Sequence, residues 1–151
     1  MLLILNIIWF ILGGWLIGLM WLFSAAILAI TIIGLPWARA AVNIGLFAFW
    51  PFGREAVNRR DVRGAPDLGT GKIGVIGNIL WFVLAGFWLA VSHVIMAIWL
   101  AVTIIGIPFA IGHLKLAGVS LFPVGKTIVP KAVAAEIARE KAQLRLAQAR
   151  Q

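Results

Sequence analysis

Two long apolar runs dominate the sequence, one at residues 2–33 and the other at residues 73–105. Residues 1–38 contain no charged side chain, and His93 is the single titratable group of residues 73–112. Each run exceeds the roughly 20 apolar residues that a helix needs to cross the hydrocarbon core of a bilayer. The pattern therefore predicts an all-α integral membrane protein of bent or paired transmembrane helices.

Each apolar run ends at a Gly-x-Pro element. Proline removes a backbone donor and clashes with the preceding turn, so we expect a helix to end or kink there. The residues of the two predicted breaks are Gly34, Pro36, Gly106 and Pro108. A helix of about 30 residues would also be about 45 Å long, so an earlier bend is expected, for which Gly13-Gly14 and Ala85-Gly86 are the candidates.

The two halves repeat one pattern at a spacing of 72 residues. Between residues 6–57 and 78–129, 18 of 52 positions are identical without a gap. The matches include Asn, Trp, Thr, Gly and Pro, which indicates an internal duplication rather than a shared apolar composition. The expected domains are a membrane repeat at 1–57, a cytoplasmic linker at 58–77, a second repeat at 78–130 and a basic helical tail at 131–151.

The segment after each break is shorter than a membrane span and carries polar groups at helical spacing. This combination predicts a short helix that lies in the membrane interface. Arg39 and Lys115 fall on similar faces of these two helices if the repeats run parallel. They are therefore candidates for contact with an anion or a lipid head group.

Few other polar side chains lie in or near the apolar runs. Asn6 and Asn78 are equivalent, and they are candidates for a helix cap, for a contact between the repeats or for the lining of a hydrated path.

Thr31 and Thr103 precede the two breaks, where a hydroxyl can bond freed backbone groups or line the same path. We expect His93 to be neutral and hydrogen-bonded to a neighbouring helix or to line the path, and His113 to be solvated near the interface.

The net charge of +8 lies mainly in the linker and the tail. Basic loops stay on the cytoplasmic side, so we expect both segments to be cytoplasmic in a multi-pass protein. An even number of crossings in each repeat satisfies this rule with parallel repeats. A single crossing in each repeat, with inverted symmetry, is the alternative. The charges contain no aromatic stacking surface, so we expect no nucleic-acid partner.

Several kinds of chemistry are absent from the sequence. It contains no cysteine, and neither apolar run contains Asp or Glu. Thiolate catalysis, cysteine-ligated metals and catalysis by paired carboxylates in the membrane are therefore excluded. The sequence also contains no glycine-rich phosphate loop and no metal-ligand spacing. We expect no enzyme activity, no metal and no cofactor.

The repeated pattern resembles the YccF-like inner membrane component domain of bacteria. The resemblance covers Asn6 to Gly53 and Asn78 to Gly125, with Thr-Ile-Ile-Gly-x-Pro and Pro-x-Gly as its most specific parts. It implies a location in the bacterial inner membrane and supplies no reaction or ligand. We expect a homo-oligomeric structural or lipid-interacting assembly with anionic lipids as partners, because small residues on the helix faces permit close contact. An oligomeric channel or anion-selective pore and an accessory subunit of a transporter are the alternatives.

Overall fold

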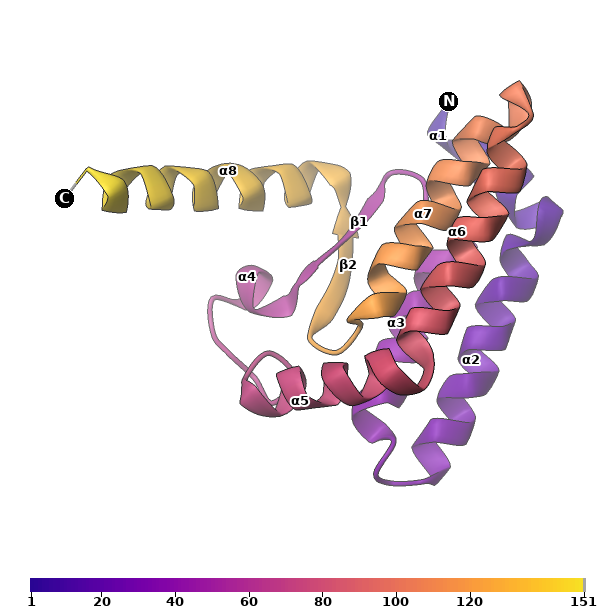
Figure 1. The fold of residues 1–151 in the computed structure, drawn as a ribbon. Coiled ribbons are helices and arrows are strands. Elements are labelled where there is room, and N and C mark those ends of the chain that lie inside the picture. Colours follow the sequence, from indigo (N-terminus) through magenta and orange to yellow (C-terminus); the bar gives the residue numbers. More distant parts are fainter. Residues whose placement is uncertain (151) are drawn as a thin grey trace.

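The computed structural model describes residues 1–150, and helices form most of it (Figure 1). The first repeat consists of α1 (Leu2–Trp9), a π-helical turn (Phe10–Gly14), α2 (Trp15–Ile30) and α3 (Leu35–Phe49). The second repeat consists of α5 (Lys72–Trp81), a π-helical turn (Phe82–Gly86), α6 (Phe87–Ala101), a 3-10 turn (Ile104–Gly106) and α7 (Ile107–Leu121). Three helical stretches are long and apolar enough to cross a membrane, namely Leu2–Ile30, Lys72–Ala101 and Ile104–Leu121. The predicted all-α membrane class is confirmed.

Both repeats bend at the expected glycines, where the π-helical turns lie. Gly13 has a φ of 141°, a backbone angle that residues with a side chain rarely adopt. A Cβ at Gly14 would lie 2.2 Å from Nε1 of Trp9, and a Cβ at Gly86 would lie 2.9 Å from the carbonyl oxygen of Ser120. The bend therefore needs glycine because the chain approaches itself too closely for a side chain. Figure 1 shows the sharp turn from α5 into α6.

The helix after each break is the second arm of a hairpin. α3 packs along α2, and α7 packs along α6 (Figure 1). Their side chains form the centre of the core, with Ile44 and Leu116 fully buried. The two predicted short helices are therefore present, and each buries one side against the preceding helix. Their position in the membrane interface stays a prediction. Pro36 and Pro108 lie in the first turns of α3 and α7, where a missing N–H is tolerated.

Small residues bring the two arms of the first hairpin together. A Cβ at Gly18 would meet the ring of Phe49, and a Cβ at Gly45 would lie 3.1 Å from the carbonyl oxygen of Gly18. Small residues on the helix faces led us to expect contacts between copies of the chain, but the contacts of Gly18 lie inside one hairpin.

An antiparallel two-stranded ribbon joins the repeats, and the sequence analysis missed it. β1 (Arg54–Asn58) follows the first hairpin and pairs with β2 (Lys126–Pro130), which follows the second. A short helix α4 (Arg59–Arg63) continues from β1, and the long α8 (Lys131–Ala149) continues from β2. Figure 1 shows α8 extending away from the hairpins.

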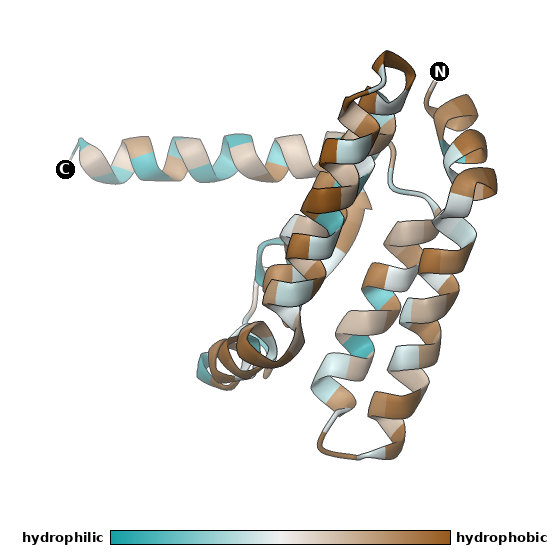
Figure 2. Cartoon of the chain, turned by 45° about the vertical axis from the view of Figure 1, so that its right-hand side comes forward, coloured by the Kyte–Doolittle hydropathy of each residue, from teal (hydrophilic) through white to brown (hydrophobic). Residues whose placement is uncertain are grey.

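The ribbon gives the chain an approximate twofold axis. Ala56 pairs with Ile128, which is its own equivalent in the second repeat. The pairing continues reciprocally, because Arg59 N–H donates to the Gly125 carbonyl at 2.7 Å and Lys131 N–H donates to the Gly53 carbonyl at 2.9 Å. The tips of the two hairpins consequently point to opposite ends of the molecule, as Figures 1 and 2 show.

Asn6 and Asn78 fix the loop between hairpin and strand in each repeat. The Asn6 side chain donates to the Phe52 carbonyl and accepts from the Phe52 N–H, both at 3.0 Å. Asn78 makes the equivalent pair with Val124, at 3.0 and 2.9 Å. Each asparagine side chain thus forms two hydrogen bonds with a single residue, one with its N–H and one with its carbonyl.

Replacing these asparagines by alanine should destabilise the fold unequally. Asn6→Ala leaves the N–H and C=O of the buried Phe52 unpaired. Each unsatisfied buried group costs about 1–3 kcal/mol, so we expect a loss of about 2–4 kcal/mol in the free energy of unfolding. Asn78 is half-buried, so water can partly replace its bonds and Asn78→Ala should cost less. Denaturant unfolding in micelles measures the stability of both variants. Equal unfolding midpoints for Asn6→Ala and the parent would refute the role of Asn6 in fixing the loop.

Candidate functional site

The threonines before each break use their hydroxyl groups on their own backbone. Thr31 donates to the Leu28 carbonyl at 2.7 Å and accepts from the Gly34 N–H at 3.1 Å. Thr103 makes the equivalent bonds in the second repeat, both at 3.0 Å. These contacts satisfy backbone groups that the interrupted helix leaves free.

His93 and His113 form a buried pair between α6 and α7. Their Nδ1 atoms lie 3.0 Å apart, and the rings are 9% and 8% exposed. The expectation of a solvated His113 was wrong, because the indole of Trp9 from the other repeat covers it at a ring distance of 5.0 Å. His93 also borders an apolar cavity of about 490 Å³ between α2 and α6.

Arg39 and Lys115 do not share a site. The Lys115 ammonium donates to the Arg54 carbonyl at 2.9 Å and pairs with the Glu55 carboxylate at 2.7 Å. Its equivalent in the first repeat is Asn43, which donates to the Lys126 carbonyl at 3.3 Å. Lys115 therefore ties α7 to the ribbon.

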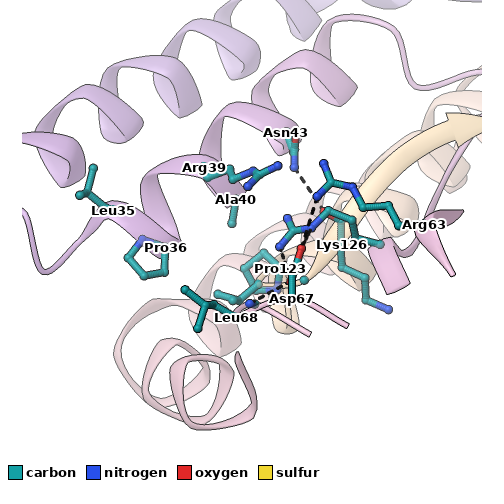
Figure 3. A pocket seen from close by; sticks show the side chains of 14 residues that line it. Leu35, Pro36, Arg39, Ala40, Asn43, Arg63, Asp67, Leu68, Pro123 and Lys126 are labelled. Atoms are coloured by element: carbon teal, nitrogen blue, oxygen red, sulfur yellow. Dashed lines mark hydrogen bonds and ion pairs between the residues drawn. The ribbon is translucent and has the colours of Figure 1, made fainter. Parts of the chain in front are cut away.

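Arg39 instead lines a basic cavity of about 370 Å³ between α3, the linker and the loop before β2. Figure 3 shows the side chains of Arg39 and Arg63 reaching into this space from α3 and α4. Arg59 and Lys126 also line it, and Asp67 is its one acidic residue among residues 1–150. We call these five residues the basic cavity.

Asp67 organises the wall of the basic cavity. Its carboxylate accepts two hydrogen bonds from the buried Arg59 guanidinium, at 2.5 and 2.9 Å, and further bonds from the N–H groups of Gly69 and Thr70, both at 3.0 Å. The Arg59 bonds hold the pKa of Asp67 well below its usual range. An Asp whose side chain accepts from the backbone N–H two residues on is a known turn signal, but the partnership with Arg59 depends on the tertiary fold.

An apolar groove of about 310 Å³ adjoins the basic cavity. Pro36, Leu68, Gly69 and Val124 line both spaces, which makes them continuous. The remaining lining residues of the groove come from α3 and from the length of α5: Trp37, Ile73, Gly74, Ile76, Gly77 and Leu80.

The duplicated hairpins define a helical membrane protein built from two copies of one unit. The chain belongs to the YccF inner membrane component domain family, whose model matches residues 4–54 and 76–126. Two relatives, the inner membrane protein YccF of Escherichia coli (strain K12) and that of Shigella flexneri, are each 35% identical over 140 residues. The match covers 91% of this chain and 93% of each relative. No solved structure matches the chain.

The equivalent glycines Gly53 and Gly125 should tolerate alanine differently. Gly53 and Gly125 both have a φ of 85°, a conformation that costs a non-glycine residue about 1–2 kcal/mol. A Cβ at Gly125 would also lie 2.4 Å from the backbone oxygen of Gly69, whereas a Cβ at Gly53 meets only the flexible end of Leu2 at 3.2 Å. We expect Gly125→Ala to lower the melting temperature clearly more than Gly53→Ala. Equal shifts would show that the linker does not pack on Gly125.

Removing the Asp67 charge should loosen the linker. The carboxylate stabilises the fold above the pKa that it has in the unfolded chain, about 4, and this stability is lost as pH falls toward the lowered folded pKa. Asp67→Asn should therefore melt below the parent at pH 7, and the difference should shrink below pH 4. Trypsin should also cleave the variant faster near Arg59 and Arg63. A difference in melting that is independent of pH would contradict this role.

Proposed function

We propose that the protein is a lipid-interacting structural component of the bacterial inner membrane whose hairpins insert from the cytoplasmic face. The observation that supports this function is the separation of charge across the fold. The four hairpin helices α2, α3, α6 and α7 contain only two charged residues, Arg39 and Lys115. Arg39 faces the basic cavity, and Lys115 bonds to β1. In Figure 2 the hairpins present mainly apolar residues.

The position of the ribbon supports one orientation in the membrane. The hairpin tips point in opposite directions, and the ribbon lies beside the middle of the hairpins (Figure 1). Hairpins that spanned the bilayer would place the charged residues Arg54, Glu55 and Lys126 at the depth of the hydrocarbon core, where charge is costly. With the ribbon on the membrane surface instead, the twofold axis follows the membrane normal and the repeats are parallel.

In this arrangement α2 and α6 lie in the cytoplasmic leaflet. A helix is about 10 Å wide, and one leaflet contributes about half of a hydrocarbon core of about 30 Å. The linker and the tail both stay on the cytoplasmic side, as their basic residues favour. The hairpins then enter and return on one side, in place of the multi-pass crossing expected from the sequence.

Cysteine labelling tests this orientation, because the chain has no native cysteine. Single cysteines at Arg60 in α4 and Arg145 in α8 report the linker and the tail, and cysteines at Ile33 and Ile105 report the two hairpin tips. Sealed vesicles of both orientations are treated with a membrane-impermeant maleimide. We expect labelling at Arg60 and Arg145 from the cytoplasmic face only, and no labelling of either tip from the periplasmic face. Tips that label from opposite faces would contradict the proposal.

The pore hypothesis receives less support. Asn6, Asn78, Thr31 and Thr103 all hydrogen-bond to backbone groups within their own repeat. Arg39 and Lys115 lie in different sites. We retain association of copies as part of the proposal, with the exposed apolar faces of α2 and α6 as the contact. The molecular mass of the purified protein in micelles measures how many copies associate.

A further inference from the structure

We propose that the basic cavity and the adjoining apolar groove together bind one anionic phospholipid. This proposal deepens the proposed function, since it names a lipid and a site for it. The phosphate would lie against the guanidinium groups of Arg39 and Arg63, and an acyl chain would lie in the groove.

The basic cavity carries more positive charge than Asp67 neutralises. Arg39 makes no hydrogen bond or ion pair with a side chain within residues 1–150, and Arg63 forms a long ion pair with Asp67 at 3.7 Å. The Asp67 carboxylate is already satisfied by Arg59 and by the linker backbone. Two exposed guanidinium groups that line one cavity suit a phosphate group, which can accept paired hydrogen bonds from each.

The groove supplies the apolar half of an amphiphile site. It continues from the basic cavity over Leu68 and Val124 and passes between α3 and α5. Ile73, Ile76 and Leu80 line it from α5. A soluble anion would use the cavity and leave this apolar surface uncovered, whereas a phospholipid covers both.

The second repeat lacks an equivalent site. At a shift of 72 residues, Arg39 corresponds to Ile111, Arg63 to Ala135 and Asp67 to Arg139. The chain also leaves α4 at Gly64, with a φ of 71°, and folds back as the linker. In the second repeat α8 continues outward instead (Figure 1). The duplicated architecture is common to both halves, so the cavity is an addition to one of them.

The test compares two double variants of the full chain, purified in detergent micelles and incubated with phosphatidylglycerol or phosphatidylcholine. Arg39→Gln with Arg63→Gln removes the two guanidinium groups that would bind the phosphate. Arg60→Gln with Arg145→Gln removes the same charge from exposed positions outside the cavity. Native mass spectrometry counts the bound lipids.

We expect the parent and the control variant to retain phosphatidylglycerol in preference to phosphatidylcholine, and the cavity variant to bind it at least about tenfold more weakly. Equal retention by the two double variants would overturn the proposal.

A groove variant separates a lipid from a free anion. A Cβ at Gly77 would have only Val124 and Trp37 near it, at 3.9 and 4.0 Å, so a larger side chain is tolerated and fills the groove. Gly77→Leu should lose phosphatidylglycerol and still bind inorganic phosphate weakly. Phosphate that binds the parent while phosphatidylglycerol does not would make the ligand a soluble anion and overturn the lipid assignment. Lipid binding in micelles does not depend on membrane orientation, so the labelling experiment and this one can fail independently.

Discussion

The pairing of β1 with β2 fixes how the two halves of this protein meet. Most of the chain is apolar helix, and in a lipid environment apolar contact between helices gives little preference over contact with lipid. Directional hydrogen bonds therefore supply the specificity. The ribbon pairs residues 54–58 with 126–130, and the bonds at Gly53 and Gly125 extend it by one residue at each end. Each half thereby carries a strand that the other half needs.

The same logic applies to the polar side chains inside each repeat. The indole of Trp9 donates to the Ala48 carbonyl at 2.7 Å, and that of Trp81 donates to the Ser120 carbonyl at 2.8 Å. Like the Asn6 and Asn78 bonds, these contacts satisfy backbone carbonyls near the end of a helix, where an unpaired group is costly away from water. The identical residues of the duplication are thus concentrated where the chain turns, because a turn exposes backbone groups that only a particular side chain can reach.

The elements that follow from local chemistry could be predicted from the sequence. Glycine and proline marked the bend and the break in each repeat, and the spacing of 72 residues gave the duplication. The ribbon could not be predicted in the same way, because each strand has five residues and its partner lies about 72 residues away. The burial of His113 was missed for a related reason, since Trp9 of the other repeat covers it. Arg39 was recognised as a candidate, but its neighbours Arg59, Arg63 and Asp67 meet it only through the fold of the linker.

The positions at which the two halves differ point to function, whereas the positions that they share point to the fold. Most positions that turn the chain are identical in both repeats, because the hairpin and its strand need them. Residue 59 and its equivalent 131 even make the same bond to a glycine carbonyl. Immediately after this point the halves diverge, since Asp67 folds the first linker back over Arg59 while α8 runs outward. Both halves share the frame at Gly53 and Gly125, but only one half gathers Arg39 and Arg63 around a cavity, and the architecture does not require this feature. That asymmetry is the physical argument for a ligand at the basic cavity.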